Sequence, residues 1–436
     1  METSAAPAIT VITWPGCPSR LLGDRPGQGR EDVVAYRGLG GYQPLASADE
    51  LLGEVERSGL QGRGGAAFPL AVKLRAVRDN GRLIVGAAGG TVVVANGEEG
   101  EPASIKDRWL LRNRPHLVLD GLRLAAAIVA ADRAYVYVSD PESARSVETA
   151  LTERAFGDIT VKLVNVDPGY IAGEETAVTR AINGGPVKPT DKPPRPFEAG
   201  VAGRPTLVSN VETLANLPYL QQHGAAAFRS LGTPMSPGTF LVTLTGTGRP
   251  PGLYEVPHGL PFTELLALHG VSSEHVRGAL LGGYFAGLLN RAVLDATLDH
   301  ETLRGLGSGL GCGAVAVITD DCPVAVAASV LAYFDRENAG QCGSCFNGTA
   351  AMAAAAGALR DGAATTQDVD RLHRWSVVLR GRGACATLDA ATNVAASLLD
   401  QFPSEVAHHL DNSCQGCRAA VFRADRPYEV EAVARA

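Results

Sequence analysis

Clustered cysteines are the residues of this sequence best suited to metal chemistry. Five of its eight cysteines lie in the last quarter of the chain, namely Cys342, Cys345, Cys385, Cys414 and Cys417. Thiolates at this density are typical of iron–sulfur and zinc sites, because soft sulfur ligands suit these metals. The first 300 residues contain only Cys17, so we expect any one-electron chemistry in the C-terminal region.

A glycine-rich loop, GRGGAAFP, runs from Gly62 to Pro69, and Lys73 follows it. Closely spaced glycines let backbone N–H groups approach a phosphate, and Arg63 adds positive charge. The spacing differs from the P-loop and from the G-x-G-x-x-G fingerprint. A plain turn is therefore the alternative interpretation.

Two acidic loops follow apolar runs that are typical of buried strands. NGEEGEP begins at Asn96 after residues 91–95, and GYIAGEET begins at Gly169 after residues 160–166. Carboxylates there can accept hydrogen bonds from a flavin or from a nucleotide, whereas a solvated acidic face is the alternative. A further loop, SNVET from Ser209, could present a helix N-terminus to a phosphate or could simply cap that helix.

The elements expected around these loops form a doubly wound α/β unit. The apolar periodicity predicts strands over 91–95, 134–138 and 160–166, and helices over 115–131 and 141–154. A βαβαβ run requires a parallel sheet, which binds ligands at the carboxyl ends of its strands. Short strand signals follow over 238–318, and helical periodicity follows over 324–334, 348–359, 367–379 and 390–402.

Composition excludes several classes of partner. The net charge of -7 without a basic run argues against nucleic acid and anionic lipid. The most apolar stretch, residues 117–131, contains Asp120 and Arg123 and is too short to span a bilayer. The N-terminus has no pattern of a secretory signal, so we expect a cytoplasmic protein without direct membrane insertion.

The order of the motifs resembles the flavoprotein subunit of respiratory complex I and the related diaphorase subunits of NAD-reducing hydrogenases and formate dehydrogenases. From residue 59 onward the chain contains GRGGAAFP, NGEEGEP, GYIAGEET, KPPRPF, SNVET, GGYFAG and GLGSG in that order. Pro, Gly and mixed charge with weak periodicity predict an irregular lead-in over residues 1–45. The resemblance implies a Rossmann-like FMN/NADH-binding domain over 46–235. A β-grasp-like (SLBB-type) domain over 236–320 and a helical iron–sulfur-type bundle with a tail over 321–436 follow.

The resemblance also assigns site residues. Positions matching the FMN site are Gly62, Arg63, Gly64, Lys73, Asn96, Glu98, Glu99, Gly173, Glu174, Asn210 and Thr213. Positions matching the NADH site are Phe68, Glu101, Glu175 and Lys192. Glu99 is a candidate for tuning the flavin, and no side chain is expected to act as catalytic acid or base, because the flavin supplies the chemistry. Ala76 stands where the family usually has a second aromatic ring for adenine.

The cluster motif of the family is altered here. The family uses E-S-C-G-x-C-x-x-C and one later cysteine, whereas this chain has Ala339 in place of the first ligand; Cys342, Cys345 and Cys385 remain. Three hypotheses stay open. A 4Fe-4S cluster could have an open iron or a fourth ligand from Cys414 or Cys417; the cluster could be lost; or Cys414 and Cys417 could bind zinc with His408 or His409. Cys312 and Cys322 are interpreted as buried small apolar side chains.

These features predict an NADH-oxidising flavoprotein electron-entry subunit, in which FMN takes a hydride and passes single electrons to an iron–sulfur acceptor. The dense carboxylates favour NADH over NADPH, because they repel a further phosphate. The expected partner is an iron–sulfur or ferredoxin-like acceptor subunit in a hetero-oligomeric complex. The alternative is a non-catalytic scaffold, or a cluster-less flavoprotein, of the same fold.

Overall fold

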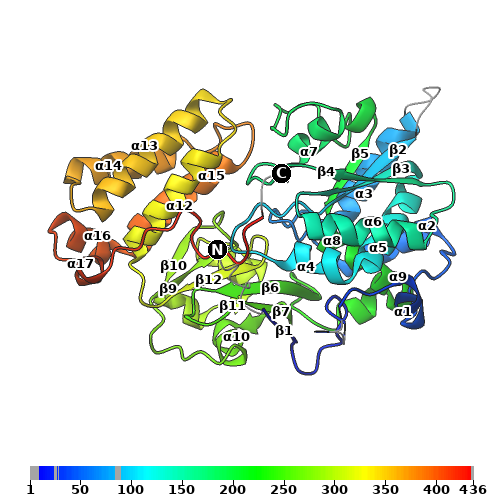
Figure 1. Cartoon of the computed structure of the whole chain (residues 1–436), viewed down its shortest axis with the longest axis horizontal. Helices are drawn as coiled ribbons and strands as arrows, with labels where there is room; N and C mark the ends of the chain where they lie inside the picture. Colours follow the sequence, from blue (N-terminus) through cyan, green and yellow to red (C-terminus); the bar gives the residue numbers. More distant parts are fainter. Residues whose placement is uncertain (1–8, 24–26, 28, 84–89, 434–436) are drawn as a thin grey trace, which may run out of the picture.

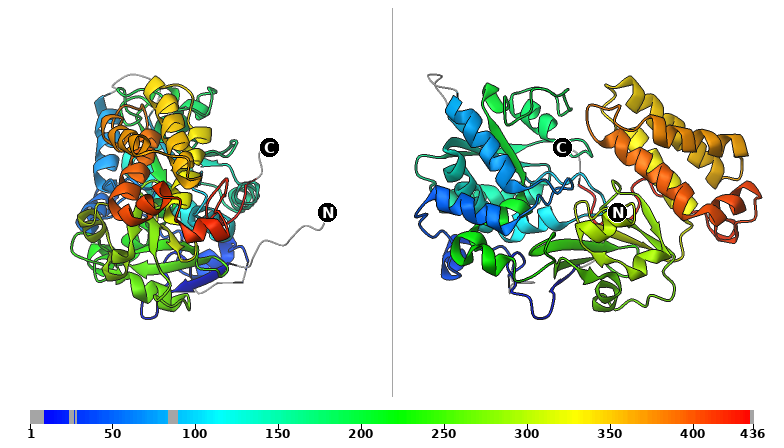
Figure 2. Two further views of the ribbon diagram at one scale, coloured as in Figure 1. Left: turned by 90° about the vertical axis from the view of Figure 1, so that its left-hand side faces the viewer. Right: turned by 180° about the vertical axis from the view of Figure 1, so that it is seen from behind.

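The computed structural model describes residues 9–23, 27, 29–83 and 90–433 (Figure 1). A parallel sheet with its helices lies on the right of that view, a second sheet lies below the centre, and the C-terminal helices lie on the left. The view from behind shows the same three regions (Figure 2).

The first sheet consists of β2 (Thr91–Asn96), β3 (Ala131–Val138), β4 (Thr160–Asn165) and β5 (Thr206–Asn210), in the order β4-β3-β2-β5. All of its pairs are parallel, which confirms the predicted βαβαβ unit. The fifteen-residue α5 (Pro115–Val129) begins with proline and is buried along most of its length against β2 and β3. It therefore forms the centre of the core on that face.

Further helices complete this unit. Its remaining helices are α1 (Val33–Gly38), α2 (Ala48–Ser58), α3 (Leu70–Leu83), α4 (Lys106–Asn113), α6 (Pro141–Glu153), α7 (Glu175–Ile182), η1 (Val201–Gly203), α8 (Val211–Ala215) and α9 (Leu217–Phe228). Val178 of α7 and Val201 of η1 pack on the opposite face of the sheet from α5, against Val92, Val94 and Val208. Helices thus cover both faces, and the carboxyl ends of the strands remain for the loops that carry the motifs.

The second sheet is mixed, in the order β1-β7-β6-β12-β9-β10. Its strands are β1 (Thr10–Thr13), β6 (Thr239–Thr245), β7 (Gly252–Pro257), β9 (Gly278–Leu281), β10 (Leu288–Asn290) and β12 (Ala314–Ile318). Around it lie α10 (Phe262–Leu268), η2 (Arg291–Asp295), α11 (His300–Gly305) and the short pair β8 (Leu260–Pro261) and β11 (Thr297–Leu298). The prediction of an irregular lead-in over 1–45 is wrong for β1, which pairs with β7 in this sheet.

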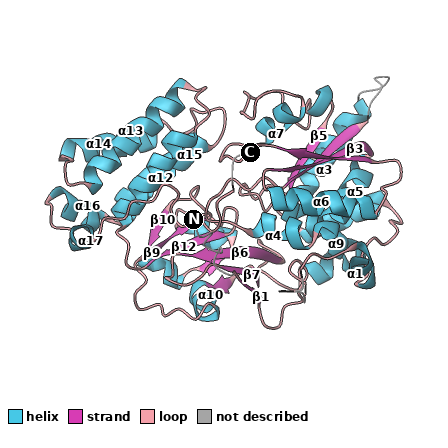
Figure 3. Ribbon diagram, viewed as in Figure 1, coloured by secondary structure: helices cyan, strands magenta, loops and turns pink. Residues whose placement is uncertain are grey.

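The C-terminal region is helical (Figure 3). It contains α12 (Pro323–Glu337), α13 (Gly343–Arg360), α14 (Thr366–Val378), α15 (Thr387–Gln401), α16 (Pro403–Leu410) and α17 (Gln415–Ala419). The strongly buried α12 packs against α13 and α15, around Phe334, Met352 and Leu398. The tail after α17 then returns to the first unit, where the N–H of Val430 donates to the carbonyl of Pro102 at 3.0 Å.

None of the helices in the described ranges is long and apolar enough to cross a membrane.

Candidate flavin, dinucleotide and iron–sulfur sites

The loops after three neighbouring strands meet at the carboxyl end of the first sheet. Glu98, after β2, accepts hydrogen bonds at Oε1 from the N–H of Gly169, after β4, at 3.4 Å and from the hydroxyl of Ser139, after β3, at 3.5 Å. Asn96 at the end of β2 donates to the carbonyl of Gly173 at 2.8 Å. The sequence analysis does not predict Ser139. Its position directly after a strand could have indicated it, because the predicted loops also follow strands.

The carboxyl of Glu98 is buried and could accept a further hydrogen bond. Its side chain is 6% exposed, and Oε2 has no hydrogen-bond partner in the part of the chain that the structure describes. Burial raises the pKa of this carboxyl to about 8. A Cβ at Gly173 would lie 2.8 Å from the same oxygen and 3.2 Å from the carbonyl oxygen of Glu98, so the absence of a side chain at Gly173 leaves room at this place. Since buried polar atoms are almost always paired, a bound ligand with N–H or O–H groups fits this cradle.

The glycine-rich loop packs onto the start of α8. The N–H of Arg63 donates to Oγ1 of Thr213 at 2.8 Å, and a Cβ at Gly64 would lie 3.2 Å from Cβ of Asn210. Asn210 caps α8 by accepting from the N–H of Glu212 at 2.9 Å. The loop, Asn210 and Thr213 are therefore brought together as predicted.

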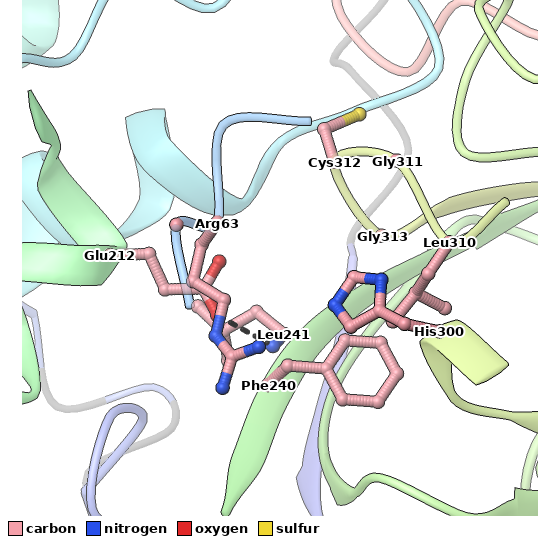
Figure 4. Close-up of a pocket in the computed structure, with 10 residues that line it drawn as sticks. Arg63, Glu212, Phe240, Leu241, His300, Leu310, Gly311, Cys312 and Gly313 are labelled. Atoms are coloured by element: carbon pink, nitrogen blue, oxygen red, sulfur yellow. Dashed lines mark hydrogen bonds and ion pairs between the residues drawn. The ribbon is translucent and has the colours of Figure 1, made fainter. Parts of the chain in front are cut away.

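The side chain of Arg63 points away from this loop (Figure 4). Its guanidinium donates to Nε2 of His258 at 2.6 Å and to the carbonyl of Thr239 at 3.2 Å, and it lies 4.0 Å from Glu212. These partners belong to the contact between the two sheets, next to a small pocket that Gly62, Leu310 and Cys312 help to line. The guanidinium predicted to face a phosphate is thus bound between the two sheets.

Glu99 is occupied by structural contacts. Its Oε1 accepts from the N–H of Asp107 at 3.2 Å, and its Oε2 accepts from the N–H of Arg108 at 3.1 Å and from the guanidinium of Arg108 at 3.3 Å. These bonds hold the first turn of α4. Beside it, Lys106 is buried between Asp107 at 2.7 Å and Glu212 at 3.0 Å. Lys106, Asp107 and Glu212 therefore form a buried group of ion pairs.

Glu101 holds a loop of the second sheet. Its Oε2 accepts from the N–H of Tyr284 at 2.9 Å and its Oε1 from the N–H of Ala103 at 3.3 Å. Burial raises the pKa of Glu101 to about 7. The side chain therefore positions the GGYFAG loop, whatever else it contacts.

A network of two lysines and two glutamates joins α3, the start of α7 and the loop after α7. Nζ of Lys73 lies 3.2 Å from Glu175, and Nζ of Lys192 lies 2.7 Å from Glu174 and 3.6 Å from Glu175. The two lysines lower the pKa of Glu175, although its burial acts in the opposite direction. Phe68 before α3 is 47% exposed, so its ring is free to stack on a planar ligand.

The cysteines of the cluster motif line one cavity. Cys342 and Cys345 at the start of α13, Cys385 before α15 and Ala339 all border it, together with Pro189 from the loop after α7. Burial and the nearby thiols of Cys385 and Cys342 raise the pKa of Cys345 to about 12. Three sulfurs thus surround a cavity whose fourth family position offers only a methyl group.

Two interpretations of the other cysteines are wrong. Cys322 is not a simple apolar side chain, because its Sγ lies 3.2 Å from Nε2 of His409 and 3.9 Å from Sγ of Cys414. Cys414 and Cys417 are not placed to complete the cluster, because they lie with Cys322 at the N-terminus of α12 whereas Ala339 follows its C-terminus. The fifteen residues of α12 separate the two places by about 22 Å at about 1.5 Å per residue.

Glycine and acidic loops at a parallel sheet edge, near a cysteine-lined cavity, define a flavin-type electron-transfer protein. Two parts of the chain match models of known protein families. Residues 55–219 match the Nuo51 FMN-binding domain, and residues 325–409 match the NADH-ubiquinone oxidoreductase-F iron-sulfur binding region. The chain belongs to the family of complex I flavoprotein subunits and is an FMN-dependent oxidoreductase of the NADH dehydrogenase/diaphorase type.

Curated relatives agree over nearly the whole chain. A type F subunit of the NADH-quinone oxidoreductase of Rhizobium meliloti is 32% identical over 87% of this chain and 94% of its own length. The HndC subunit of the NADP-reducing hydrogenase of Solidesulfovibrio fructosivorans is 31% identical over 92% of this chain and 85% of its own length.

A solved structure gives the same result. A chain of an NAD+-reducing [NiFe]-hydrogenase in the air-oxidized state superposes with a TM-score of 0.75 at 30% identity. The match covers 84% of this chain but only 63% of the hydrogenase chain. The similarity supports the mixed α/β fold, and the match spans less than two thirds of that hydrogenase chain.

Proposed function

We propose that this chain is the electron-entry subunit of a larger complex, where it oxidises NADH at an FMN site and passes electrons toward an iron–sulfur acceptor subunit. The observation that carries the proposal is the buried Oε2 of Glu98 beside Gly173, which has no partner among the described residues and lies at the sheet edge where the glycine loop also lies. FMN, when bound, accepts a hydride and returns electrons singly.

The chain's own residues would hold the flavin by hydrogen bonding. Glu98 accepts from its N–H groups, and the backbone of Gly62, Gly64 and the start of α8 presents N–H groups to its phosphate. Arg63 contributes through its backbone, since its guanidinium is bound to His258. Glu99 acts indirectly, because it holds the first turn of α4.

The nucleotide would bind over Glu175 and Lys192, which pair with the FMN-site positions Lys73 and Glu174. Phe68 supplies an exposed ring for adenine, and the carboxylates accept hydrogen bonds from ribose hydroxyls. The two lysines are already paired with Glu174 and Glu175, so no unpaired lysine of this network is left for a further phosphate, and we propose NADH as the preferred substrate.

The three thiolates of Cys342, Cys345 and Cys385 would hold a 4Fe-4S cluster with one iron not bound by protein. Thiolate ligands and a shared cavity support this assignment. Nζ of Lys188 donates to the carbonyl of Ala339 at 2.8 Å, and Gln341 donates to the carbonyl of Pro189 at 2.8 Å. The loop that carries Lys192 therefore also contacts the cluster loop, which favours transfer between the two sites.

The same proposal sets the domains at 46–235, 236–320 and 321–436, with a β-grasp-like middle domain and a C-terminal helical bundle. A core cluster whose buried members all lie within residues 240–317 supports the middle domain, while the core of the C-terminal helices also includes Leu280, Leu288 and Ile318 of the second sheet. Relatives whose names describe subunits of larger assemblies support an iron–sulfur partner.

The decisive experiment is flavin identification with single-turnover reduction. Purified protein, reconstituted and then denatured, should release FMN and no FAD, and NADH should bleach the flavin absorbance anaerobically. A matched Gly173→Ala variant should lose flavin, because the added Cβ meets Glu98. Protein that folds but binds no flavin would instead support a scaffold of the same fold.

A further inference from the structure

Four potential metal ligands meet at the far end of the helical region from the cluster cavity. They are Cys322, His409, Cys414 and Cys417, and no two of their ligand atoms are more than 4.8 Å apart. Cys322 precedes α12, His409 lies in the last turn of α16, and Cys414 and Cys417 bracket the start of α17. Three separate chain segments therefore converge on one point.

The spacing fits a tetrahedral ion. Zinc binds sulfur at about 2.3 Å and nitrogen at about 2.0–2.1 Å, so tetrahedral corners lie about 3.8 Å apart for two sulfurs and about 3.6 Å apart for sulfur and nitrogen. Sγ of Cys322 and Sγ of Cys414 are 3.9 Å apart. Nε2 of His409 lies 3.2 Å from Sγ of Cys322 and 3.6 Å from Sγ of Cys417.

The imidazole is already oriented for this role. Nδ1 of His409 lies 3.0 Å from the carbonyl of Leu359, to which it donates its proton, so the lone pair of Nε2 faces the sulfurs. Such a hydrogen bond to the second ring nitrogen is the usual support of a metal-binding histidine. His409 is 2% exposed, whereas its neighbour His408 is exposed.

The surroundings suit thiolates. Cys322 is the N-cap residue of the fifteen-residue α12, so the positive end of that helix dipole favours a thiolate at this position. Three thiolates with a dication leave one negative charge, and the guanidinium of Arg360 lies close enough to Cys417 to interact with it. Cys322 is buried, so the site is shielded on one side.

We propose that Cys322, His409, Cys414 and Cys417 bind a structural zinc ion, separate from the flavin and from the cysteines around Ala339. All four positions are filled by protein, as in zinc sites that stabilise folds and perform no catalysis. The ion ties the start of α12 to α16 and α17 and anchors the tail that follows. The proposal does not depend on NADH oxidation.

The first test is the metal content of the full-length protein, produced with zinc and iron both supplied. Wild type should contain about one zinc per chain. His409→Gln and Cys414→Ser/Cys417→Ser should lower bound zinc by about tenfold or more while FMN stays bound. His408→Gln is the matched control and should keep zinc, and Cys345→Ser should lose iron but keep zinc.

A second test uses wild type alone, in case the variants do not fold. Native alkylation followed by mass spectrometry should leave Cys322, Cys414 and Cys417 unmodified until a chelator removes zinc, while Cys17 reacts similarly before and after. Wild type without zinc, zinc retained in both variants, iron in place of zinc at this site, or a Cys322–Cys414 disulfide would each overturn the proposal.

Discussion

The carboxyl of Glu98 is buried where β2, β3 and β4 end, and its pKa is raised from 4.5 to about 8. The folded, flavin-free protein therefore holds the proton more tightly than the unfolded chain. The resulting stability is complete below about pH 4.5 and is lost as pH rises through about 8.

For this reason, Glu98→Gln should flatten part of that pH dependence in the flavin-free protein. From pH 5 to pH 8.5, wild type should lose at least about 1 kcal/mol more unfolding free energy than the variant, because only wild type must ionise the buried carboxyl. Urea denaturation at the two pH values measures the difference. Glu148→Gln, on the exposed face of α6, is the control, and parallel curves for Glu98→Gln and wild type would contradict the assignment.

Glu175 is the clearest residue for testing the nucleotide site, because its carboxylate pairs with lysines and accepts no backbone bond among the hydrogen bonds described. Glu175→Ala should raise the KM for NADH by about tenfold, equivalent to about 1.4 kcal/mol, with FMN retained. Glu101→Ala is less specific, since it also releases the N–H of Tyr284. Steady-state kinetics with ferricyanide decide the point, and equal loss of FMN would assign Glu175 to the flavin.

Ala339 borders the cluster cavity at the position of the missing ligand. Ala339→Cys should provide a fourth thiolate, so the variant should retain more iron and acid-labile sulfide than wild type after purification in air. Ala339→Ser adds a similar volume without a thiolate and should behave as wild type. An air-stable cluster in wild type, or no iron in any of the three proteins under anaerobic purification, would refute the three-thiolate assignment.

The helices position the flavin loops, and α5 and α8 pack closely against each other. A Cβ at Gly121 in α5 would lie 2.0 Å from the carbonyl oxygen of Leu214 in α8. Gly121→Ala should therefore separate the helices, lower stability by about 2 kcal/mol or more, and weaken FMN binding by shifting Asn210 and Thr213. Gly357→Ala in α13 meets only the end of Arg360 at 4.0 Å.

Gly357→Ala is the control and should be neutral or stabilising by up to about 1 kcal/mol, because alanine favours a helix over glycine. Thermal unfolding followed by flavin fluorescence compares the two variants. If both shift the midpoint equally, the close approach of α5 and α8 does not position the flavin loops.

Elements with strong local periodicity were predictable from the sequence. Strands β2, β3 and β4 and helices α5 and α6 lie within a few residues of their predicted bounds, because apolar runs and prolines at helix starts act locally. β1 was missed, since its four residues are a strand only through pairing with β7, far along the chain. The order of the loops was predictable, but the direction of the Arg63 side chain depends on His258, 195 residues away.

The cysteines show the same limit. Cys342 and Cys345 could be recognised because their spacing is local, and the structure places Cys385 at the same cavity. The role of Cys322 could not be predicted, because its partners His409 and Cys414 are 87 and 92 residues away and no local pattern marks it. Sequence motifs therefore identify loops well, whereas the side chains that long-range packing brings together must be observed.

At the scale of the whole molecule, the tail after α17 connects the helical region to the flavin unit. The hydroxyl of Tyr284 donates to the carbonyl of Pro427, and the N–H of Val430 donates to that of Pro102. Arg112 pairs with Glu431 at 2.8 Å, and Arg108, the partner of Glu99, donates to the carbonyl of Glu431 at 2.8 Å. The tail thus contacts Pro102 at the end of the acidic loop and Arg108 next to it, and these contacts stabilise the loop.

Truncation after Ala419 should therefore affect the flavin as well as the helical region. Val430 is 7% exposed and lies in the core of the first unit, so its loss alone should remove about 2 kcal/mol of stability. Without the carbonyl of Glu431, Arg108 loses one partner, and the acidic loop should become looser, with weaker FMN binding and a lower unfolding midpoint. Truncation after Val433 keeps every one of these contacts and serves as control. Equal FMN affinity in the two truncated proteins, measured by fluorescence titration, would show that α4 and the acidic loop are held without the tail.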